Sequence, residues 1–148
     1  AALFSVPFLL ARRDPRPFPG VADAAAAGVW LVAVGGEWLA DAQLARFRAE
    51  PANRGRTCRA GLWGWSRHPN YFFEWLHWWA YVPPALGAPW GWLALGGPAA
   101  MLYLLFRVTG IPKNEARALE TRGDDYRDYQ RRTSVFIPLP PRRVPRDG

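Results

Sequence analysis

Apolar residues are gathered in three long stretches, and polar, arginine-rich segments separate them. Segment 21–39 contains only Asp23 and Glu37 as charged residues, segment 71–86 contains only Glu74, and segment 90–106 contains none. About 20 apolar residues in a helix cross a hydrocarbon core of about 30 Å. Each stretch is close to that length, so the pattern predicts three membrane-spanning helices.

The short connection between the second and third stretches carries no charge. It holds Pro83, Pro84 and the segment 87–89, whose glycine and proline are typical of a tight turn. The two stretches are therefore predicted to form a helical hairpin. The alternative is a hairpin buried in the core of a water-soluble domain, which would have to bury nearly all of the 9 tryptophans.

The distribution of charge predicts the side of the membrane that each connection occupies. Segment 41–70 holds six arginines against two acids, and segment 107–148 holds ten basic residues against six acids. The positive-inside rule places both segments on the cytoplasmic side. Arg12, Arg13 and Arg16 oppose this orientation, but they form the smaller group.

The predicted fold class is all-α: a multi-pass transmembrane helical bundle with an amphipathic C-terminal helix on the cytoplasmic side. One membrane domain is expected to cover 1–148, with a basic tail at 142–148 that is expected to be disordered. The apolar run 1–11 has no basic region before it, so it is interpreted as the end of a membrane helix rather than as a signal peptide. The chain is accordingly expected to be the C-terminal fragment of a longer protein.

Composition and motifs exclude several kinds of site. The formal net charge is +7, but it lies in connections between membrane segments, so a nucleic acid is not expected as a partner. The single cysteine, Cys58, excludes an internal disulfide. His68 and His77 have no cysteine or aspartate at ligand spacing, so no metal site is predicted. The sequence also lacks the glycine-rich phosphate loops and the nucleophile-elbow motif.

The segment 61–79 combines polar residues with a dense aromatic run, and its sequence is GLWGWSRHPNYFFEWLHWW. Ser66 is predicted to cap a helix that has Pro69 in its first turn. In that helix Asn70, Glu74 and His77 are spaced i, i+4 and i+7. This spacing predicts one polar stripe among the aromatic side chains.

The neighbouring segments carry further polar groups. Glu37 and Asp41 form an acidic pair one helical turn apart. The pair is either a solvated face, with Asp41 paired to Arg46 or Arg48, or a pair that faces a protein cavity. The basic segment 51–59 either contacts anionic lipid headgroups or lines a phosphate site.

The C-terminal part is predicted to be helical over 114–132, after a helix stop at 109–112. Tyr126 and Tyr129 lie there among arginines. One interpretation is a surface amphipathic helix followed by a basic, disordered end. The other is a site in which the tyrosines stack on an adenine ring and arginines bind a 2′-phosphate.

Three motifs of the chain resemble one family, and the resemblance spans 35–141. They are EWLADAQLARFR, SRHPNYFFEWLHWW and DDYRDYQRRTSVFIPLPP. The family consists of bacterial membrane proteins related to the C-terminal domain of steroid 5-alpha-reductases. Sterol C14-reductases and isoprenylcysteine carboxyl methyltransferases are more distantly similar. In the reductases the corresponding positions hold NADPH in a pocket at the cytoplasmic face, and in the methyltransferases a comparable pocket holds S-adenosylmethionine.

The resemblance implies a cofactor site in this chain, formed by polar and aromatic side chains of the three motifs. The candidate residues are Asp41, Arg48, Arg67, His68, Asn70, Glu74, Tyr126, Tyr129 and Arg132. The implied activity is the NADPH-dependent reduction of a carbon–carbon double bond in a lipophilic, steroid- or isoprenoid-like enone that enters from the bilayer. The alternatives are a methyltransferase that uses S-adenosylmethionine and a non-enzymatic membrane scaffold. Membrane lipids are the other expected partners, and the implied location is the bacterial inner membrane.

The chain departs from the reductase pattern in two places. Asn114 and Glu115 stand where two acids are expected, which leaves the role of Glu115 open. The N-terminal half that carries the substrate-facing acid and tyrosine of the reductases is not found here, so the catalytic residues are unknown. Tyr71 and Tyr103 are candidate proton donors by residue type alone.

Overall fold

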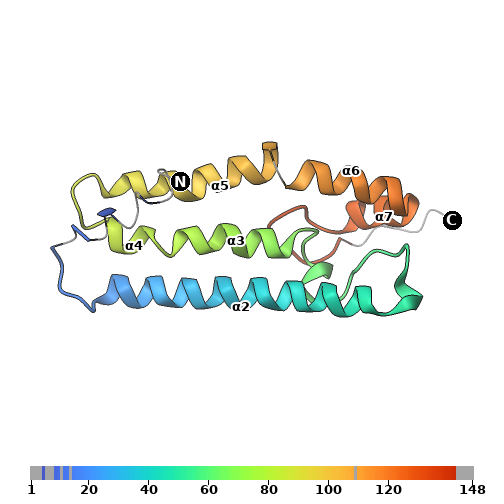
Figure 1. Cartoon of the computed structure of the whole chain (residues 1–148), viewed down its shortest axis with the longest axis horizontal. Helices are drawn as coiled ribbons and strands as arrows, with labels where there is room; N and C mark the ends of the chain where they lie inside the picture. The colour runs from blue at the N-terminus through green and yellow to red at the C-terminus, as the bar shows by residue number, and fades with distance from the viewer. Residues whose placement is uncertain (1–4, 6–8, 11, 14, 109, 143–148) are drawn as a thin grey trace.

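The computed structural model describes residues 5, 9–10, 12–13, 15–108 and 110–142, and the fold is built from helices. No strand occurs in these ranges, so the all-α prediction is confirmed for them. The predicted end of a membrane helix at 1–11 and the predicted disordered tail at 142–148 fall mostly outside the described residues. Figure 1 shows three helical layers lying side by side, with the C-terminal helices at one end.

The longest element is α2, Val21–Ala49, and it has 29 residues. It begins where the Gly20 backbone N–H donates a hydrogen bond to Asp23 Oδ2 at 2.8 Å. At 1.5 Å per residue it is roughly 43 Å long, which exceeds the thickness of a hydrocarbon core. The apolar stretch 21–39 and the polar motif after it therefore belong to one continuous helix, as predicted.

The predicted hairpin is confirmed, although its two arms are interrupted. The first arm consists of α3, Pro69–Trp79, and α4, Val82–Ala85. The second consists of η3, Gly91–Leu95, then α5, Gly96–Tyr103, and then η4, Leu104–Val108. Figure 1 shows α5 running back along α3. The first arm breaks before α4 because a proline has no N–H to continue the ladder of the preceding helix.

The prediction that Ser66 caps α3 is wrong. The N-cap position is His68, whose side chain makes no capping hydrogen bond. Ser66 instead accepts a hydrogen bond from the His68 backbone N–H and donates one to the Phe136 carbonyl at 2.7 Å. The Ser66 hydroxyl therefore makes a tertiary contact with the C-terminal segment and does not cap the helix.

Helices α2 and α3 approach each other closely at Gly36. A Cβ atom at this position would overlap the ring of Phe73, whereas one at the adjacent Gly35 would meet no atom. The small residue lets the two helix backbones come together. This approach sets the alignment of α2 with α3, and thus the position of the polar groups that follow on both helices.

Many large apolar side chains on the bundle face outward. They include Leu31, Val32 and Trp38 on α2, and Trp90 and Trp92 at the hairpin turn. The water-soluble alternative required nearly all tryptophans to be buried. Several are exposed instead, and the exposed fraction of Trp38 reaches 71%. Lipid is the solvent that such a surface suits.

One helical run among the described residues, Gly91–Arg122 apart from residue 109, is long and apolar enough to cross a membrane, because an 18-residue window within it has a mean hydropathy of 1.4. Length and composition alone support this assignment, which favours membrane association. α3 falls short because it ends at Trp79 after 11 residues. The three-span topology therefore remains a prediction.

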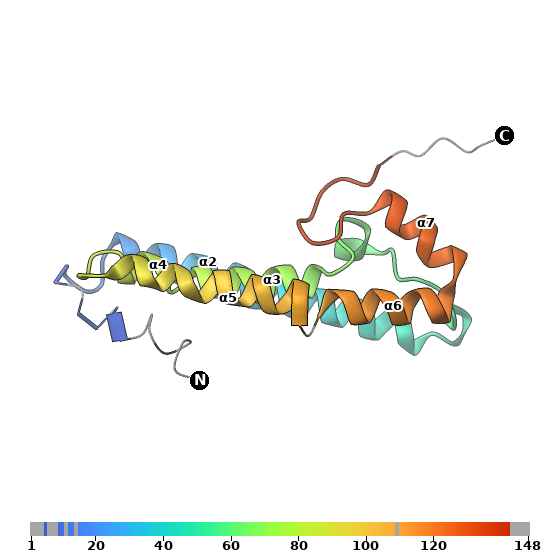
Figure 2. The same ribbon diagram turned by 90° about the horizontal axis from the view of Figure 1, so that it is seen from above.

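The C-terminal part forms two helices where one was predicted. They are α6, Ile111–Arg122, and α7, Asp124–Arg132. Gly123 lies between them with φ +53, a conformation that favours glycine. Figure 2 shows that α7 turns away from the axis of α6 and that the chain after α7 loops back toward the bundle. The turn at Gly123 therefore brings Tyr126 and Tyr129 of α7 to the segment 61–79, which a single straight helix would not do.

Candidate functional site

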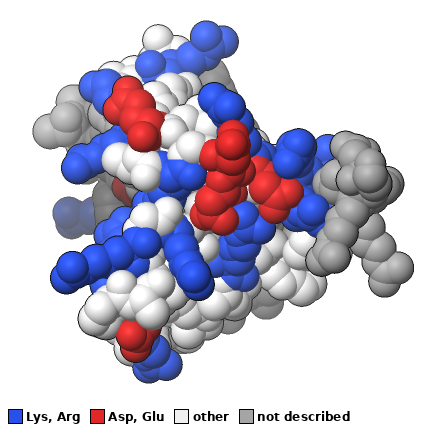
Figure 3. All heavy atoms as spheres, turned by 90° about the vertical axis from the view of Figure 1, so that its right-hand side faces the viewer, with Lys and Arg blue, Asp and Glu red and all other residues white. Residues whose placement is uncertain are grey.

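One end of the bundle is polar, and four segments meet there. They are the end of α2 with the loop after it, the residues just before α3, α6 and α7. Figure 3 shows basic side chains over much of this end and acidic ones in smaller groups. The segments 41–70 and 107–142, whose basic charge suggested a common side of the membrane, therefore lie at one end of the molecule.

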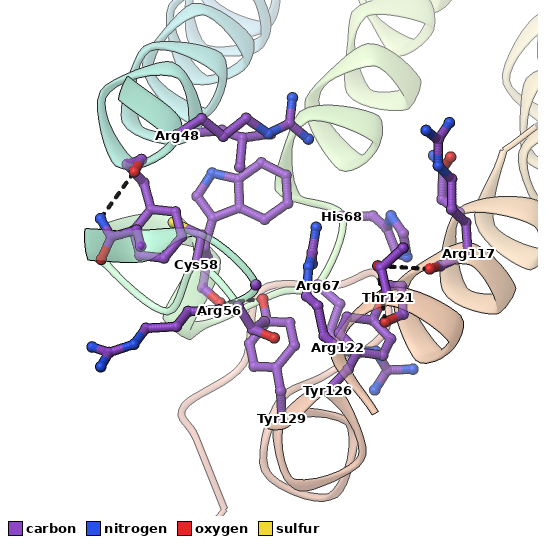
Figure 4. A pocket seen from close by; sticks show the side chains of 18 of the residues that line it. Arg48, Arg56, Cys58, Arg67, His68, Arg117, Thr121, Arg122, Tyr126 and Tyr129 are labelled. Atoms are coloured by element: carbon purple, nitrogen blue, oxygen red, sulfur yellow. Dashed lines mark hydrogen bonds between the residues drawn. The ribbon is translucent and has the colours of Figure 1, made fainter. Parts of the chain in front are cut away.

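A cavity of about 780 Å³ opens at this polar end. Ligand sites are commonly about 300–1,000 Å³, so the volume suits a nucleotide-sized molecule. Figure 4 shows arginine, tyrosine and histidine side chains around it, contributed by elements far apart in the sequence. The lining residues that matter below are Asp41, Arg48, Arg54, Arg56, Cys58, Trp63, Arg67, His68, Asn70, Tyr71, Asn114, Arg117, Thr121, Arg122, Tyr126 and Tyr129.

The cavity is strongly cationic, because six arginines line it and Asp41 is the one acid among its lining residues. Five of these arginines form no ion pair within 4.0 Å with a described carboxylate; they are Arg48, Arg54, Arg56, Arg117 and Arg122. Guanidinium groups match phosphate oxygens with two parallel hydrogen bonds. The site is therefore suited to an anionic ligand.

The sixth arginine, Arg67, has a structural task. Its Nε donates to Glu115 Oε1 at 2.6 Å, and its Nη1 donates to the carbonyl oxygens of Gln130 and Thr133. These bonds connect the segment 61–79, to which Arg67 belongs, with α6 and with the end of α7. Glu115 also accepts a hydrogen bond from Gln130 Nε2 at 3.0 Å. The role that the sequence left open for Glu115 is thus that of a shared acceptor behind the cavity wall.

His68 and Tyr71 form one part of the wall. Their rings are stacked, with centroids 5.5 Å apart, and His68 Nε2 lies 3.4 Å from Glu115 Oε1. The Tyr71 hydroxyl accepts a hydrogen bond from Asn114 Nδ2 at 2.8 Å. Tyr71 is therefore held with its hydroxyl at the cavity, whereas Tyr103, the other tyrosine considered as a proton donor, is exposed on α5 and does not line it.

Tyr126 and Tyr129 form another part of the wall and are almost fully buried. Tyr126 donates to Glu115 Oε1 at 3.3 Å, and burial together with the charge of Glu115 raises the pKa of Tyr126 to about 12. Tyr129 donates to the carbonyl oxygens of Trp63 and Ser66, and its pKa is also raised, chiefly by burial. Both phenols are therefore neutral near pH 7, and their hydroxyls anchor the wall.

The rim nearest the bundle is formed by Asp41 and Asn70. Asn70 Nδ2 donates to Asp41 Oδ1 at 3.1 Å, so the partner of Asp41 is an amide of α3. The alternative of a solvated face, with Asp41 paired to Arg46 or Arg48, finds no such ion pair among the described residues. Asp41 is exposed and lines the cavity, whereas Glu37 does not line it, so the cavity interpretation holds for Asp41 and not for the pair.

Seven of the nine candidate residues line the cavity: Asp41, Arg48, Arg67, His68, Asn70, Tyr126 and Tyr129. The other two lie elsewhere. Glu74 is half-buried further along α3, near Glu37 and Asp41 of α2. Arg132 is bound to Asp128 on its own helix, with Nε 2.9 Å from Oδ1, and does not line the cavity.

The sequence analysis missed the cavity face of α6. Its lining residues are Asn114, Arg117, Ala118, Thr121 and Arg122, which follow the spacing i, i+3, i+4, i+7 and i+8. This spacing marks one face of a helix, so the signal was present.

A cluster of ion pairs joins the loop after α2 to α7. Arg59 binds Asp125 and Asp128, each at 2.8 Å, and the Thr57 backbone N–H donates to Asp125 Oδ2 at 2.7 Å. Hydrogen bonds from Arg59 and Arg132 lower the pKa of Asp128 to about 2. The loop that carries Arg54, Arg56 and Cys58 is thereby fixed to α7. Burial raises the pKa of the Cys58 thiol, so it is not poised as a nucleophile.

The sequence was also compared with models of protein families, and one of them matches. The model described as "Protein of unknown function (DUF1295)" matches residues 1–133. Comparisons with curated proteins and with solved structures give no significant match. The match covers nearly all of the polar end as well as the hairpin, and the chain therefore belongs to the DUF1295 family.

Proposed function

We propose that this protein is an integral-membrane, NADPH-dependent reductase of a carbon–carbon double bond in a lipophilic enone. The observation that carries the proposal is the cavity of about 780 Å³ with five arginines that no described carboxylate neutralises. The resemblance of the motifs around it to the C-terminal domain of steroid 5-alpha-reductases agrees with this assignment. The proposed arrangement is multi-pass, with the cavity on the cytoplasmic side of the bacterial inner membrane.

The charge of the cavity favours NADPH over S-adenosylmethionine. NADPH carries a diphosphate and a 2′-phosphate, whereas S-adenosylmethionine has no phosphate and carries a cationic sulfonium group. Five guanidinium groups and one carboxylate would stabilise the first molecule and repel the sulfonium of the second. The aromatic residues Trp63, Tyr126 and Tyr129 add apolar surface for the adenine and nicotinamide rings.

Each part of the wall then has a task. Arginines of the loop after α2 and of α6 bind phosphates, while Asn70, held by Asp41, offers an amide to the nicotinamide carboxamide. Bound NADPH supplies a hydride, and the protein supplies orientation and excludes water. Tyr71, whose hydroxyl is held by Asn114, is the proposed holder of the proton that the reduced substrate takes up.

The decisive experiment is titration of the purified protein in lipid nanodiscs with NADPH, NADH and S-adenosylmethionine. NADPH is expected to bind more tightly than NADH, and S-adenosylmethionine is expected not to bind. Arg117→Ala should weaken NADPH binding roughly 10- to 150-fold, which corresponds to ~1.5–3 kcal/mol for a charge-assisted hydrogen bond. Lys113→Ala is the matched control, because Lys113 is an exposed cation of the same helix that does not line the cavity.

Two outcomes contradict the proposal. Binding of S-adenosylmethionine without binding of either nicotinamide cofactor would favour the methyltransferase alternative. Failure of all three ligands to bind at millimolar concentration would favour the non-enzymatic scaffold. In the scaffold case the polar contacts of Asp41 and Asn70 would be contacts between helices and not ligand contacts.

A further inference from the structure

Three large apolar side chains are exposed at the polar end, away from the cavity. They are Trp65, at 49% exposure, Ile137, at 55%, and Leu139, at 50%. We refer to Trp65, Ile137 and Leu139 as the apolar rim. Neighbouring surfaces at this end are rich in charged groups, so an apolar cluster here needs its own explanation.

Hydrogen bonds fix the apolar rim in place. The Leu139 backbone N–H donates to the Trp65 carbonyl at 3.0 Å, and the Arg67 backbone N–H donates to the Ser134 carbonyl at 2.8 Å. Between them, Ser66 Oγ donates to the Phe136 carbonyl. The segment 134–139 is thus held against 65–67 along its length. The side chains of the apolar rim are therefore exposed on a segment whose backbone is fixed by hydrogen bonds.

An inward anchor determines which way the rim faces. Phe136 is only 4% exposed and packs against Phe72, Trp75 and Phe106 of the hairpin. Its chain neighbour Ile137 is displayed outward. Figure 2 shows the segment after α7 looping back from the polar end to the level at which α3 begins. The rim therefore lies where the apolar bundle meets the polar end.

From this position we infer that the apolar rim inserts into the boundary between headgroups and acyl chains of the leaflet next to the cavity. The partner is the anionic lipid surface of that leaflet. Tryptophan and aliphatic side chains favour this depth. Arg131 and Arg142 are exposed nearby in the chain, and each basic side chain near an anionic leaflet adds attraction.

The contact would couple the bilayer to the cavity. The residues after Trp65 in the chain, Ser66 and Arg67, hold the tail, and Arg67 lines the cavity. Lipid that covers the rim therefore stabilises the segment from which the cavity wall is built. The inference rests on the membrane-spanning part of the proposed function and is independent of the cofactor.

The test is the depth of spin labels in nanodiscs of phosphatidylethanolamine and phosphatidylglycerol, in a Cys58→Ala background. Labels at Ile137→Cys and, separately, Leu139→Cys are compared with a label at Leu31→Cys on the exposed apolar face of α2 and one at Glu120→Cys on the exposed face of α6. Power saturation gives the ratio of collisions with oxygen, which dissolves in lipid, to collisions with a water-soluble nickel chelate. Circular dichroism confirms that each variant is folded.

The expected ratio at positions 137 and 139 is severalfold higher than at position 120 and lower than at position 31. A ratio equal to that at position 120 overturns the inference while leaving the membrane assignment intact, provided that position 31 reports lipid. Loss of lipid contact at position 31 would overturn the membrane-spanning arrangement itself. Low collision rates with both reagents, with broadening between labels, would show a contact between copies of the chain instead of lipid.

Discussion

Replacing Gly36 or Gly35 with alanine tests how the approach of α2 to α3 supports the cavity. A Cβ at Gly36 would overlap the ring of Phe73, while one at Gly35 meets open space. Alanine is favoured over glycine in a helix interior by about 0.8–1.0 kcal/mol. Gly35→Ala should therefore stabilise the protein by about that amount.

Gly36→Ala receives the same helix contribution but also overpacks the interface, which costs about 1–3 kcal/mol. The two variants should consequently differ by about 1–3 kcal/mol in the free energy of unfolding, with Gly36→Ala the less stable. For a chain of this size each kcal/mol corresponds to about 2–4 °C in Tm. The overlap also pushes α2 from α3 close to the Asp41–Asn70 hydrogen bond of 3.1 Å, so NADPH affinity should fall in the same variant.

The assay is thermal unfolding in one detergent, followed by NADPH titration of the folded protein. Gly35→Ala is the control for helix propensity, for handling and for the added methyl group. Equal melting temperatures, or a higher one for Gly36→Ala, would refute the reasoning, because the contact with Phe73 would then not limit the packing of the two helices.

Three further predictions concern α6, α7 and the turn between them. Arg122→Ala should weaken NADPH binding roughly 10- to 150-fold, because a cavity-lining cation is lost, whereas Arg127→Ala, which removes an exposed cation, should not change the titration. The pKa of Asp128 lies at about 2, below its unfolded value of 3.8, so its contribution to stability is present above pH 3.8 and is lost as the pH falls toward 2. Unfolding curves from pH 7 to 2.5 should therefore shift less for Asp128→Asn than for the wild type, while Asp124→Asn should follow the wild type. Gly123→Ala should lower Tm, since φ +53 strains a residue with a Cβ by ~1 kcal/mol, and unchanged melting would contradict this.

The helices and their order could be predicted because their signals are local. Segment 21–39 and the polar motif after it form one helix, and the uncharged connection around Pro83 and Pro84 marks the hairpin. The turn at Gly123 was missed because a glycine within a charged, helix-favouring segment does not reveal from sequence alone which φ it adopts.

The sequence predicted which residues belong to the candidate site better than it predicted the contacts that those residues make. Asp41, Asn70 and Tyr126 were singled out from motifs and do line the cavity. Arg132 was singled out on the same grounds, yet Asp128, one helical turn before it, binds its guanidinium. A charged residue near an acid at i−4 has a partner within its own helix, and its availability for a ligand depends on that competition.

The sequence by itself determined the helical class, the extent of α2 and the hairpin. It also determined the cationic character of segments 41–70 and 107–142, which the fold brings to the polar end. These properties follow from hydrophobic runs, prolines and net charge, which act over a few neighbouring residues. Only the tertiary structure decided that Glu115 binds Arg67 and that Ser66 bonds Phe136 instead of capping a helix. Those contacts join residues 48 and 70 positions apart. Their partners are selected by how α2, α3 and the folded-back tail pack, which no local pattern encodes.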